Sequence, residues 1–180
     1  MKILGIDPGS RICGYGVIEV SGNSVRVIEY GIIRVAKKNA DLPERLLAIY
    51  DRLTKVIKRT KPDVAAFESL FFSKNVQSLV KLSHARGVAV LAAVENKLHI
   101  SEFSPREIKK SVSGNGNAGK EQVQFMVKTI LGIDETPEFY DVTDALAVAI
   151  CHSIRSNKQM SGVKSWKEFV EQNPDRIAKD

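Results

Sequence analysis

The sequence predicts an α/β fold, with a mixed five-stranded sheet and helices on both faces. Three observations lead to this prediction. Three strand-like segments open the chain, two more alternate with helical segments, and helices close the chain. A length of 180 residues fits one compact domain with a sizeable hydrophobic core.

The strands are predicted from short apolar and β-branched stretches bounded by turn signals. Residues 2–7 form an apolar run that ends at a Pro-Gly turn, and residues 13–20 and 24–35 flank Ser-Gly-Asn, a hairpin signal. Residues 63–68 and 98–103 supply the fourth and fifth strands. The fourth strand is apolar until it ends on an acid.

The helices are predicted from apolar residues at helical spacing. Asp41 and Glu44 have the spacing of a capping box before a helix over residues 42–57, and Lys61-Pro62 ends that helix. Further helices are expected over residues 75–96, 105–112, 120–131 and 141–154, and a flexible Gly- and Asn-rich segment over residues 114–119. We assign residues 1–156 to one domain. Residues 157–180 form a C-terminal tail of unknown role, which folds as a peripheral helix or remains loose.

The composition is that of a globular protein, with 43% hydrophobic and 27% charged residues and no apolar run near the roughly 18 residues that a membrane helix requires. The N-terminus reaches Asp7 and a Pro-Gly turn before a signal-peptide core forms, so we expect a cytoplasmic protein without a membrane partner. Cys13 and Cys151 lie among apolar neighbours and form no CxxC pair. This predicts two reduced core thiols rather than a zinc site.

The positive charge is concentrated in one third of the chain. The net charge is +6, and residues 71–130 contain nine Lys or Arg against four Glu, an excess of five. A surface that follows phosphates requires such a concentration of positive charge. The distribution therefore favours a polyanionic partner, although a mildly basic protein need not have one.

Four acids are candidates for one metal site. Asp7 and Glu68 end strands that this element order makes plausible neighbours, whereas Asp141 and Asp144 lie three apart, on one face at the start of the last helix. Converging carboxylates repel one another unless a cation lies between them, and hard oxygen ligands select Mg²⁺ or Mn²⁺. Two such ions can assist an in-line displacement at phosphorus, so the pattern favours nuclease chemistry.

Three of these acids also have a structural explanation. Asp141 and Asp144 would serve as a helix cap and a first-turn acid, and Asp7 as a turn residue before Pro8. Glu68 is harder to explain in this way, because an acid that closes an apolar strand loses solvation unless it is paired or exposed.

These residues belong to an ordered set of motifs that resembles the RuvC family of Holliday-junction resolvases. The similarity runs from residue 1 to about residue 154. The matching segments are residues 5–9 (GIDPG), 67–68 (FE), 71–75 (FFSKN), 84–88 (HARGV) and 141–147 (DVTDALA). A single GIDPG would be weak evidence, but the ordered set is specific.

The resemblance implies an RNase H-like fold and cleavage of two opposed strands of a four-way DNA junction, in recombination and repair, leaving 5′-phosphate and 3′-hydroxyl ends. It implies Mg²⁺, which Mn²⁺ can replace, with two ions at an active site formed by Asp7, Glu68, Asp141 and Asp144. Some family members carry His where this chain has Asp141. As partners it implies a second copy, in a two-fold symmetric homodimer whose interface helix resembles residues 75–96, and a RuvA- and RuvB-like branch-migration helicase complex.

Six residues form the predicted DNA-binding set. Phe71 corresponds to the aromatic that contacts bases near the junction centre, unless it is a core residue of its Phe-Phe pair. Lys109 and Lys120 correspond to positions near the DNA backbone, although isolated lysines are usually solvated. Basic residues from the charged third complete the set: Lys74, Arg86 and Lys110.

Three other functions remain open at this point. An actin-like or sugar-kinase ATPase begins with a strand similar to residues 5–7, but it needs two such domains and a second phosphate loop, for which 180 residues leave no room. A junction-binding protein without catalytic activity is disfavoured because all four acids are present. An RNase H-like nuclease acting on RNA would be separated by comparing junction, duplex and RNA substrates.

Overall fold

A computed structural model describes residues 1–160 except residues 23, 35–40, 70–74 and 134–139. The described strands form one sheet in the order β3-β2-β1-β4-β5. The central strand β1 (Lys2–Asp7) pairs antiparallel with β2 (Ile12–Ser21), which pairs antiparallel with β3 (Ser24–Arg34). On its other side β1 pairs parallel with β4 (Val64–Glu68), which pairs parallel with β5 (His99–Phe103). The predicted mixed five-stranded sheet is confirmed.

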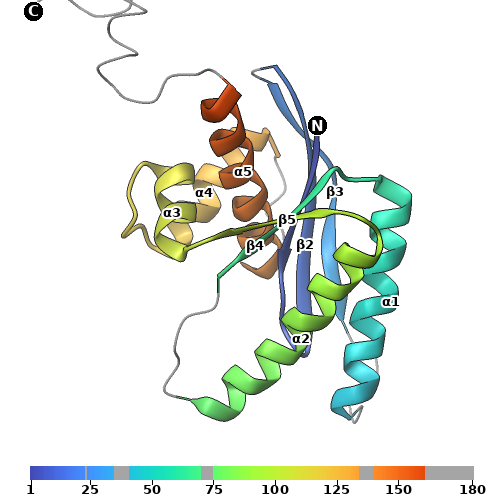
Figure 1. The fold of residues 1–180 in the computed structure, drawn as a ribbon. Coiled ribbons are helices and arrows are strands. Elements are labelled where there is room, and N and C mark those ends of the chain that lie inside the picture. Colours follow the sequence, from blue (N-terminus) through green and yellow to red (C-terminus); the bar gives the residue numbers. More distant parts are fainter. Residues whose placement is uncertain (23, 35–40, 70–74, 134–139, 161–180) are drawn as a thin grey trace, which may run out of the picture.

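Helices cover both faces of the sheet, as predicted (Figure 1). Helices α1 (Leu42–Thr60) and α2 (Val76–Glu95) pack on one face. Helices α3 (Pro105–Ser113), α4 (Lys120–Leu131) and α5 (Tyr140–Met160) pack on the other. Within this second layer, α5 contacts β1 and β2 directly, while α3 and α4 pack against α5.

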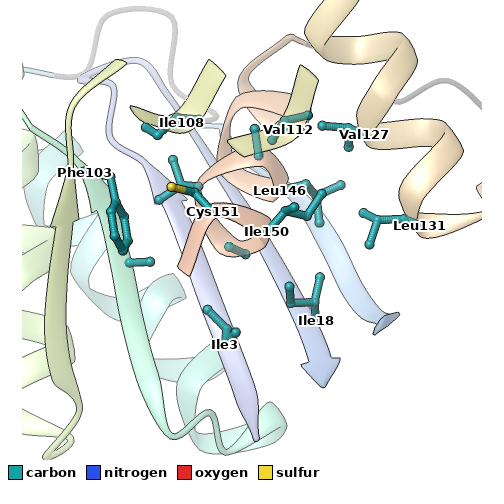
Figure 2. Packing of buried hydrophobic residues seen from close by; sticks show 14 of the residues in the cluster. Ile3, Ile18, Phe103, Ile108, Val112, Val127, Leu131, Leu146, Ile150 and Cys151 are labelled. Atoms are coloured by element: carbon teal, nitrogen blue, oxygen red, sulfur yellow. The ribbon is translucent and has the colours of Figure 1, made fainter. Parts of the chain in front are cut away.

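Two hydrophobic cores lie on the two faces of the sheet because side chains alternate along each strand. Ile3 packs with Leu146 and Ile150 of α5 (Figure 2). Ile6 and Phe67 belong to the core under α1 and α2. Residues that follow these two along β1 and β4 therefore point to the opposite face, toward α5.

Local capping signals explain where two of the helices begin. The side chain of Asp41 accepts a hydrogen bond of 2.9 Å from the backbone N–H of Glu44, as the sequence predicted. A reciprocal capping box lies at Ser104 and Glu107, at the start of α3. Each bond satisfies a backbone donor that has no partner within its helix.

The last helix is longer than predicted, because its backbone continues to Met160 rather than ending at residue 154. The apolar periodicity ends near Ile154, but the next six residues include no Gly or Pro, so helical propensity alone extends the helix. The helix crosses the predicted boundary at residue 156. That boundary and the role of residues 157–180 stay predictions.

Two other expectations concern the membrane and the thiols. Among the described helices, none combines the length and the apolar character needed to cross a bilayer. Cys13 and Cys151 are both free and buried, as predicted.

Candidate active site

Asp7 and Glu68 lie side by side at the ends of two parallel strands. Ile6 pairs with Phe67 in the β1–β4 register, so the next residue of each strand lies at the same edge of the sheet. Both acids follow residues of the α1–α2 core and therefore point toward α5. The predicted pairing of these strands is confirmed, and it explains how two acids 61 positions apart meet.

The remaining two acids reach the same place because α5 packs very closely on β1 and β2. A Cβ atom added at Gly5 would lie 1.9 Å from the carbonyl oxygen of Ala145, and one added at Gly14 would lie 2.0 Å from that of Asp141. Only glycine permits such an approach of two backbones. Since Gly14 pairs with Asp7, the same contact places the first turn of α5 beside Asp7.

The four predicted acids line one pocket of about 410 Å³ together with two lysines. The lining residues are Asp7, Glu68, Pro105, Ile108, Lys109, Lys120, Val123, Asp141, Asp144 and Ala147. The two lysines come from α3 and α4, and the acids from β1, β4 and α5. Six charged side chains from five elements thus converge on one pocket. The first of these elements, β1, and the last, α5, lie at opposite ends of the described chain.

Burial and mutual repulsion raise the pKa values of three of the acids. The pKa of Asp7 rises from 3.8 to about 7, first because the carboxyl is buried and then because Asp144, Asp141 and Glu68 are close. Burial and Asp144 raise the pKa of Glu68, and burial is the largest cause of the raised pKa of Asp144. The ionised forms of these carboxylates are therefore stabilised by any group or ion that brings positive charge into the pocket.

Lys120 supplies part of that positive charge. Its Nζ atom lies 3.5 Å from Oδ2 of Asp144 and 5.6 Å from the centre of the Tyr140 ring. Lys120 lowers the pKa values of Asp7, Glu68 and Asp144, and Lys109 lowers those of Glu68 and Asp144. Because the Lys120 side chain is 66% exposed, it can also contact a ligand that enters the pocket.

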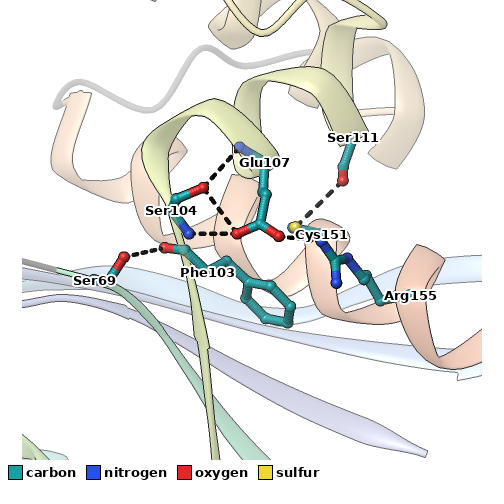
Figure 3. A network of polar contacts seen from close by, with 7 residues as sticks. All are labelled: Ser69, Phe103, Ser104, Glu107, Ser111, Cys151 and Arg155. Carbon is teal, nitrogen blue, oxygen red and sulfur yellow. Dashed lines mark hydrogen bonds and ion pairs between the residues drawn. The ribbon is translucent and has the colours of Figure 1, made fainter.

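A polar network fixes α3, which carries Lys109, to α5, which carries two of the acids (Figure 3). Glu107 accepts hydrogen bonds from the backbone N–H and the hydroxyl of Ser104, and it pairs with Arg155 of α5. Ser111 of α3 and Cys151 of α5 form a second contact, with 3.3 Å between Oγ and Sγ. Helix α3 is thereby held in place beside the pocket.

The predicted DNA-binding residues are distributed unevenly around this site. Lys109 and Lys120 line the pocket, and Lys110 is exposed on the neighbouring part of α3. Phe71 and Lys74 lie outside the described residues. The side chain of Arg86 is only 11% exposed and has protein partners.

Sequence reasoning assigned no role to Tyr140 or to the glycines under α5. Tyr140 is exposed beside Asp141 and approaches Lys120. The signal in the sequence that could have identified Tyr140 is its position directly before the 141–147 motif. The role of Gly14 had no sequence signal, because it depends on which helix packs against β2.

The chemistry of the pocket suits a hard divalent cation. The pocket presents four carboxylates, and the described residues that line it include neither imidazole nor thiol groups. The nearby thiol of Cys13 is kept neutral, since burial and the adjacent Asp7 raise its pKa to about 12. Within the described residues, no three His, Cys, Asp or Glu side chains are already arranged to hold an ion. The acids therefore share a pocket without forming a preassembled set of ligands.

Comparison with known proteins gives consistent results. The family model for "Crossover junction endodeoxyribonuclease RuvC" matches residues 3–152. A protein of that name from Chloroherpeton thalassium is 44% identical over 99% of this chain and 100% of the relative. Another from Cytophaga hutchinsonii is 41% identical over 97% of this chain and 87% of the relative.

A solved structure, "T. thermophilus RuvC in complex with Holliday junction substrate", superimposes with a TM-score of 0.83. It is 31% identical and covers 88% of this chain and 96% of the solved chain. The RNase H-like fold implied by the sequence is confirmed. With a family match over most of its length and relatives above 40% identity, this chain belongs to the RuvC family of crossover junction endodeoxyribonucleases.

Proposed function

We propose that this chain resolves four-way (Holliday) DNA junctions, in recombination and repair, by hydrolysing paired phosphodiesters to leave 5′-phosphate and 3′-hydroxyl ends. The observation that carries the proposal is the convergence of Asp7, Glu68, Asp141 and Asp144 on one pocket. The Thermus thermophilus relative was solved with a Holliday junction, which supports the same substrate here. A DNA substrate also agrees with a cytoplasmic location.

RuvC enzymes are metal-dependent nucleases. In this chain Asp7, Glu68, Asp141 and Asp144 would hold Mg²⁺, or Mn²⁺ in its place, with two ions per site. When bound, such ions lower the pKa of a water molecule and neutralise charge at the scissile phosphate. Asp7, whose pKa is about 7, must lose its proton before it can serve as a ligand.

The lysines of the pocket are placed to bind the DNA backbone. Lys109 and Lys120 line its wall beside the acids, and an ammonium group can hold a phosphate oxygen and stabilise its charge. Lys110, exposed on the neighbouring part of α3, extends this contact. Lys74 and Phe71 lie outside the described residues; we assign Lys74 to the DNA backbone as a basic residue, and Phe71 to bases near the junction centre on the family resemblance. These contacts give an affinity that falls with salt, while junction shape provides most of the selectivity.

Helix α2 has a surface suited to a second copy of the chain. Exposed apolar residues recur along it at helical spacing around Gly87, where a Cβ would meet no atom within 4 Å among the described residues beyond its own helical turns. They are Val76, Val80, Leu91 and Val94. A stripe of this kind, which we call the α2 stripe, supports a two-fold homodimer in which each subunit cuts one strand. The RuvA- and RuvB-like helicase partner rests on family membership.

The substitution Asp7→Asn tests the proposed function. We expect the variant to bind a synthetic four-way junction with unchanged affinity but to lose Mg²⁺-dependent cleavage, because it removes a ligand and leaves the basic surface intact. Binding is measured by mobility shift in EDTA, and cleavage by mapping cut sites on a mobile junction. Cleavage by Asp7→Asn at the wild-type rate would refute the assignment of the acids.

Two controls separate the alternatives. Duplex DNA and RNA substrates of matched length distinguish junction resolution from an RNase H-like activity on RNA. Reactions with Mg²⁺, Mn²⁺ or EDTA show whether the pocket requires a divalent cation. Junction binding without any cleavage by the wild type would identify a binding protein instead of a nuclease.

A further inference from the structure

The guanidinium group of Arg86 is committed to protein contacts at the end of β4. Its Nη1 donates a hydrogen bond of 2.9 Å to the backbone carbonyl oxygen of Glu68, and its Nη2 lies 2.7 Å from Oε1 of Glu102. Its Cζ atom lies 5.3 Å from the centre of the Phe67 ring. Charge-assisted hydrogen bonds of this kind are stronger than neutral ones and restrict geometry.

Arg86 approaches β4 from the face opposite the active-site pocket. It belongs to α2, and Phe67, over which it lies, is part of the core under α1 and α2. The Glu68 carboxyl group lines the pocket on the other face. Arg86 therefore holds the main chain of Glu68 and leaves both carboxylate oxygens available to the pocket. From this side of the sheet, it does not reach a phosphate that lies against the acids.

The peptide that follows Glu68 is held from two directions. The backbone N–H of Ser69 donates to the carbonyl oxygen of Phe103 at 2.8 Å, and the Ser69 hydroxyl contacts the same oxygen at 3.1 Å (Figure 3). Arg86 holds the other end of this peptide, the Glu68 carbonyl. Fixing both ends sets the backbone of Glu68 where β4 leaves the sheet, and with it the direction of the acid side chain.

We propose that Arg86 is a positioning residue for Glu68, oriented by Glu102, and not a contact to DNA. This assignment replaces the DNA-binding role predicted from its place in a basic stretch. It also links α2, which carries the α2 stripe, to an acid of the active site. The inference rests on the proposed function, because that function gives Glu68 its role as a metal ligand of the active site.

Three variants test this role. Arg86→Gln removes the guanidinium group, Glu102→Gln removes the charge that orients it, and Lys81→Gln removes one exposed positive charge from the same helix as a control. For each variant we would measure junction affinity in EDTA as a function of salt, Mn²⁺ binding to the free protein by calorimetry, thermal unfolding, and the Mg²⁺ concentration that gives half-maximal cleavage.

We expect Arg86→Gln to weaken Mn²⁺ binding, and to raise the Mg²⁺ requirement, by about tenfold or more, as is typical when a residue that holds a metal ligand is lost. Glu102→Gln should produce a smaller change in the same direction, and Lys81→Gln none. Junction affinity and its salt dependence should match the wild type for Arg86→Gln. If Arg86→Gln fails to fold, the Glu102→Gln result decides the matter.

Two results would overturn the proposal. One is a loss of junction affinity in Arg86→Gln with a salt slope reduced by about 0.9, which would identify a direct phosphate contact. The other is a lowered melting temperature with unchanged metal binding in both variants, which would show a purely structural ion pair. A wild-type protein that fails to cleave junctions contradicts the proposed function, whereas the calorimetric comparison would still test Arg86.

Discussion

Gly14 lies against the carbonyl oxygen of Asp141, at a distance that leaves no room for a side chain. A Cβ atom at this position would lie 2.0 Å from that oxygen and 3.0 Å from the Cβ of Asp141 itself. Gly14 also pairs with Asp7 across the β1–β2 ladder. One glycine therefore sets the separation between a strand-borne acid and a helix-borne acid of the same pocket.

The first prediction concerns the substitution Gly14→Ala. The added methyl group must push the first turn of α5 away from β2, and overpacking of this kind costs about 1–3 kcal/mol of stability. We expect the melting temperature to fall and Mg²⁺-dependent cleavage to drop by more than the loss of folded protein explains. Thermal unfolding and junction cleavage at saturating Mg²⁺ measure the two effects.

The matched control is Gly16→Ala in the same strand. Its Cβ would lie 2.4 Å from Cδ2 and 2.7 Å from Cγ of the buried Leu146 side chain but 3.5 Å from Leu146 Cα, so the clash is with a side chain and not with the backbone of α5. We expect Gly16→Ala to lose stability yet keep most of its cleavage activity. Equal losses of activity in the two variants would show that the spacing of the acids is not set at Gly14.

The second prediction is a pH dependence of stability caused by Asp7. Its pKa in the folded protein is about 7, above the ordinary value of 3.8, so the folded protein holds this proton more tightly than the unfolded chain does. The stabilising contribution is complete below pH 3.8, declines as the pH rises toward 7, and is lost above 7. In EDTA, Asp7→Asn should therefore become increasingly more stable than the wild type across this range.

Divalent cations should reverse this difference. Mg²⁺ binds the ionised carboxylates, so it should raise the melting temperature of the wild type above pH 7 more than below it, and raise that of Asp7→Asn much less. If the difference in melting temperature between the wild type and Asp7→Asn is the same at every pH, with or without Mg²⁺, the pKa of Asp7 is not raised.

The third prediction concerns Lys120. Its ammonium group lowers the pKa values of Asp7, Glu68 and Asp144, so Lys120→Gln should raise all three. We expect the rising limb of the cleavage rate against pH to shift toward higher pH. Rates measured from acidic to alkaline pH at fixed Mg²⁺ provide the test. Lys110→Gln, which changes an exposed lysine outside the pocket lining, is the control and should leave the limb in place.

The fourth prediction concerns the α2 stripe. Leu91 is 57% exposed, and Leu91→Glu places a charge within the α2 stripe that forms the proposed dimer interface. We expect a shift from dimer to monomer in sedimentation velocity, together with loss of paired cuts on a junction. Phe125→Glu is the control, because Phe125 is also well exposed, at 66%, on α4, on the opposite side of the sheet. A dimer that tolerates Leu91→Glu and dissociates with Phe125→Glu would place the interface on α4.

The fifth prediction concerns Phe71, which lies outside the described residues. If it stacks on bases near the junction centre, Phe71→Ala should slow cleavage far more than it weakens binding, since stacking on one base contributes about 1–3 kcal/mol. Single-turnover cleavage of a synthetic junction gives the rate, and a mobility shift gives the affinity. Unchanged turnover would favour the alternative of a core Phe.

The order and type of the elements, and the four acids that converge on one pocket, could be predicted from the sequence. Each depends on local information: the apolar run of β1, turn residues after Asp7, the cap at Asp41, and the spacing of Asp141 and Asp144 on one helical face. The family motifs added the function, because Asp7, Glu68 and the 141–147 segment occur in a specific order. Local propensity was less informative at the end of α5, where helix-forming residues continue past the last apolar one.

The contacts of these residues could not be predicted from the sequence, because they depend on how distant elements pack. In the sequence, Arg86 could not be distinguished from a DNA-binding residue. An arginine binds a phosphate or a backbone carbonyl according to which group the fold brings close to it, and here that group is the carbonyl of Glu68. The raised pKa of Asp7 and the need for glycine at position 14 likewise depend on α5 packing against strands more than a hundred residues away. Burial, charge repulsion and backbone clearance act through space, so the linear order of residues does not specify them.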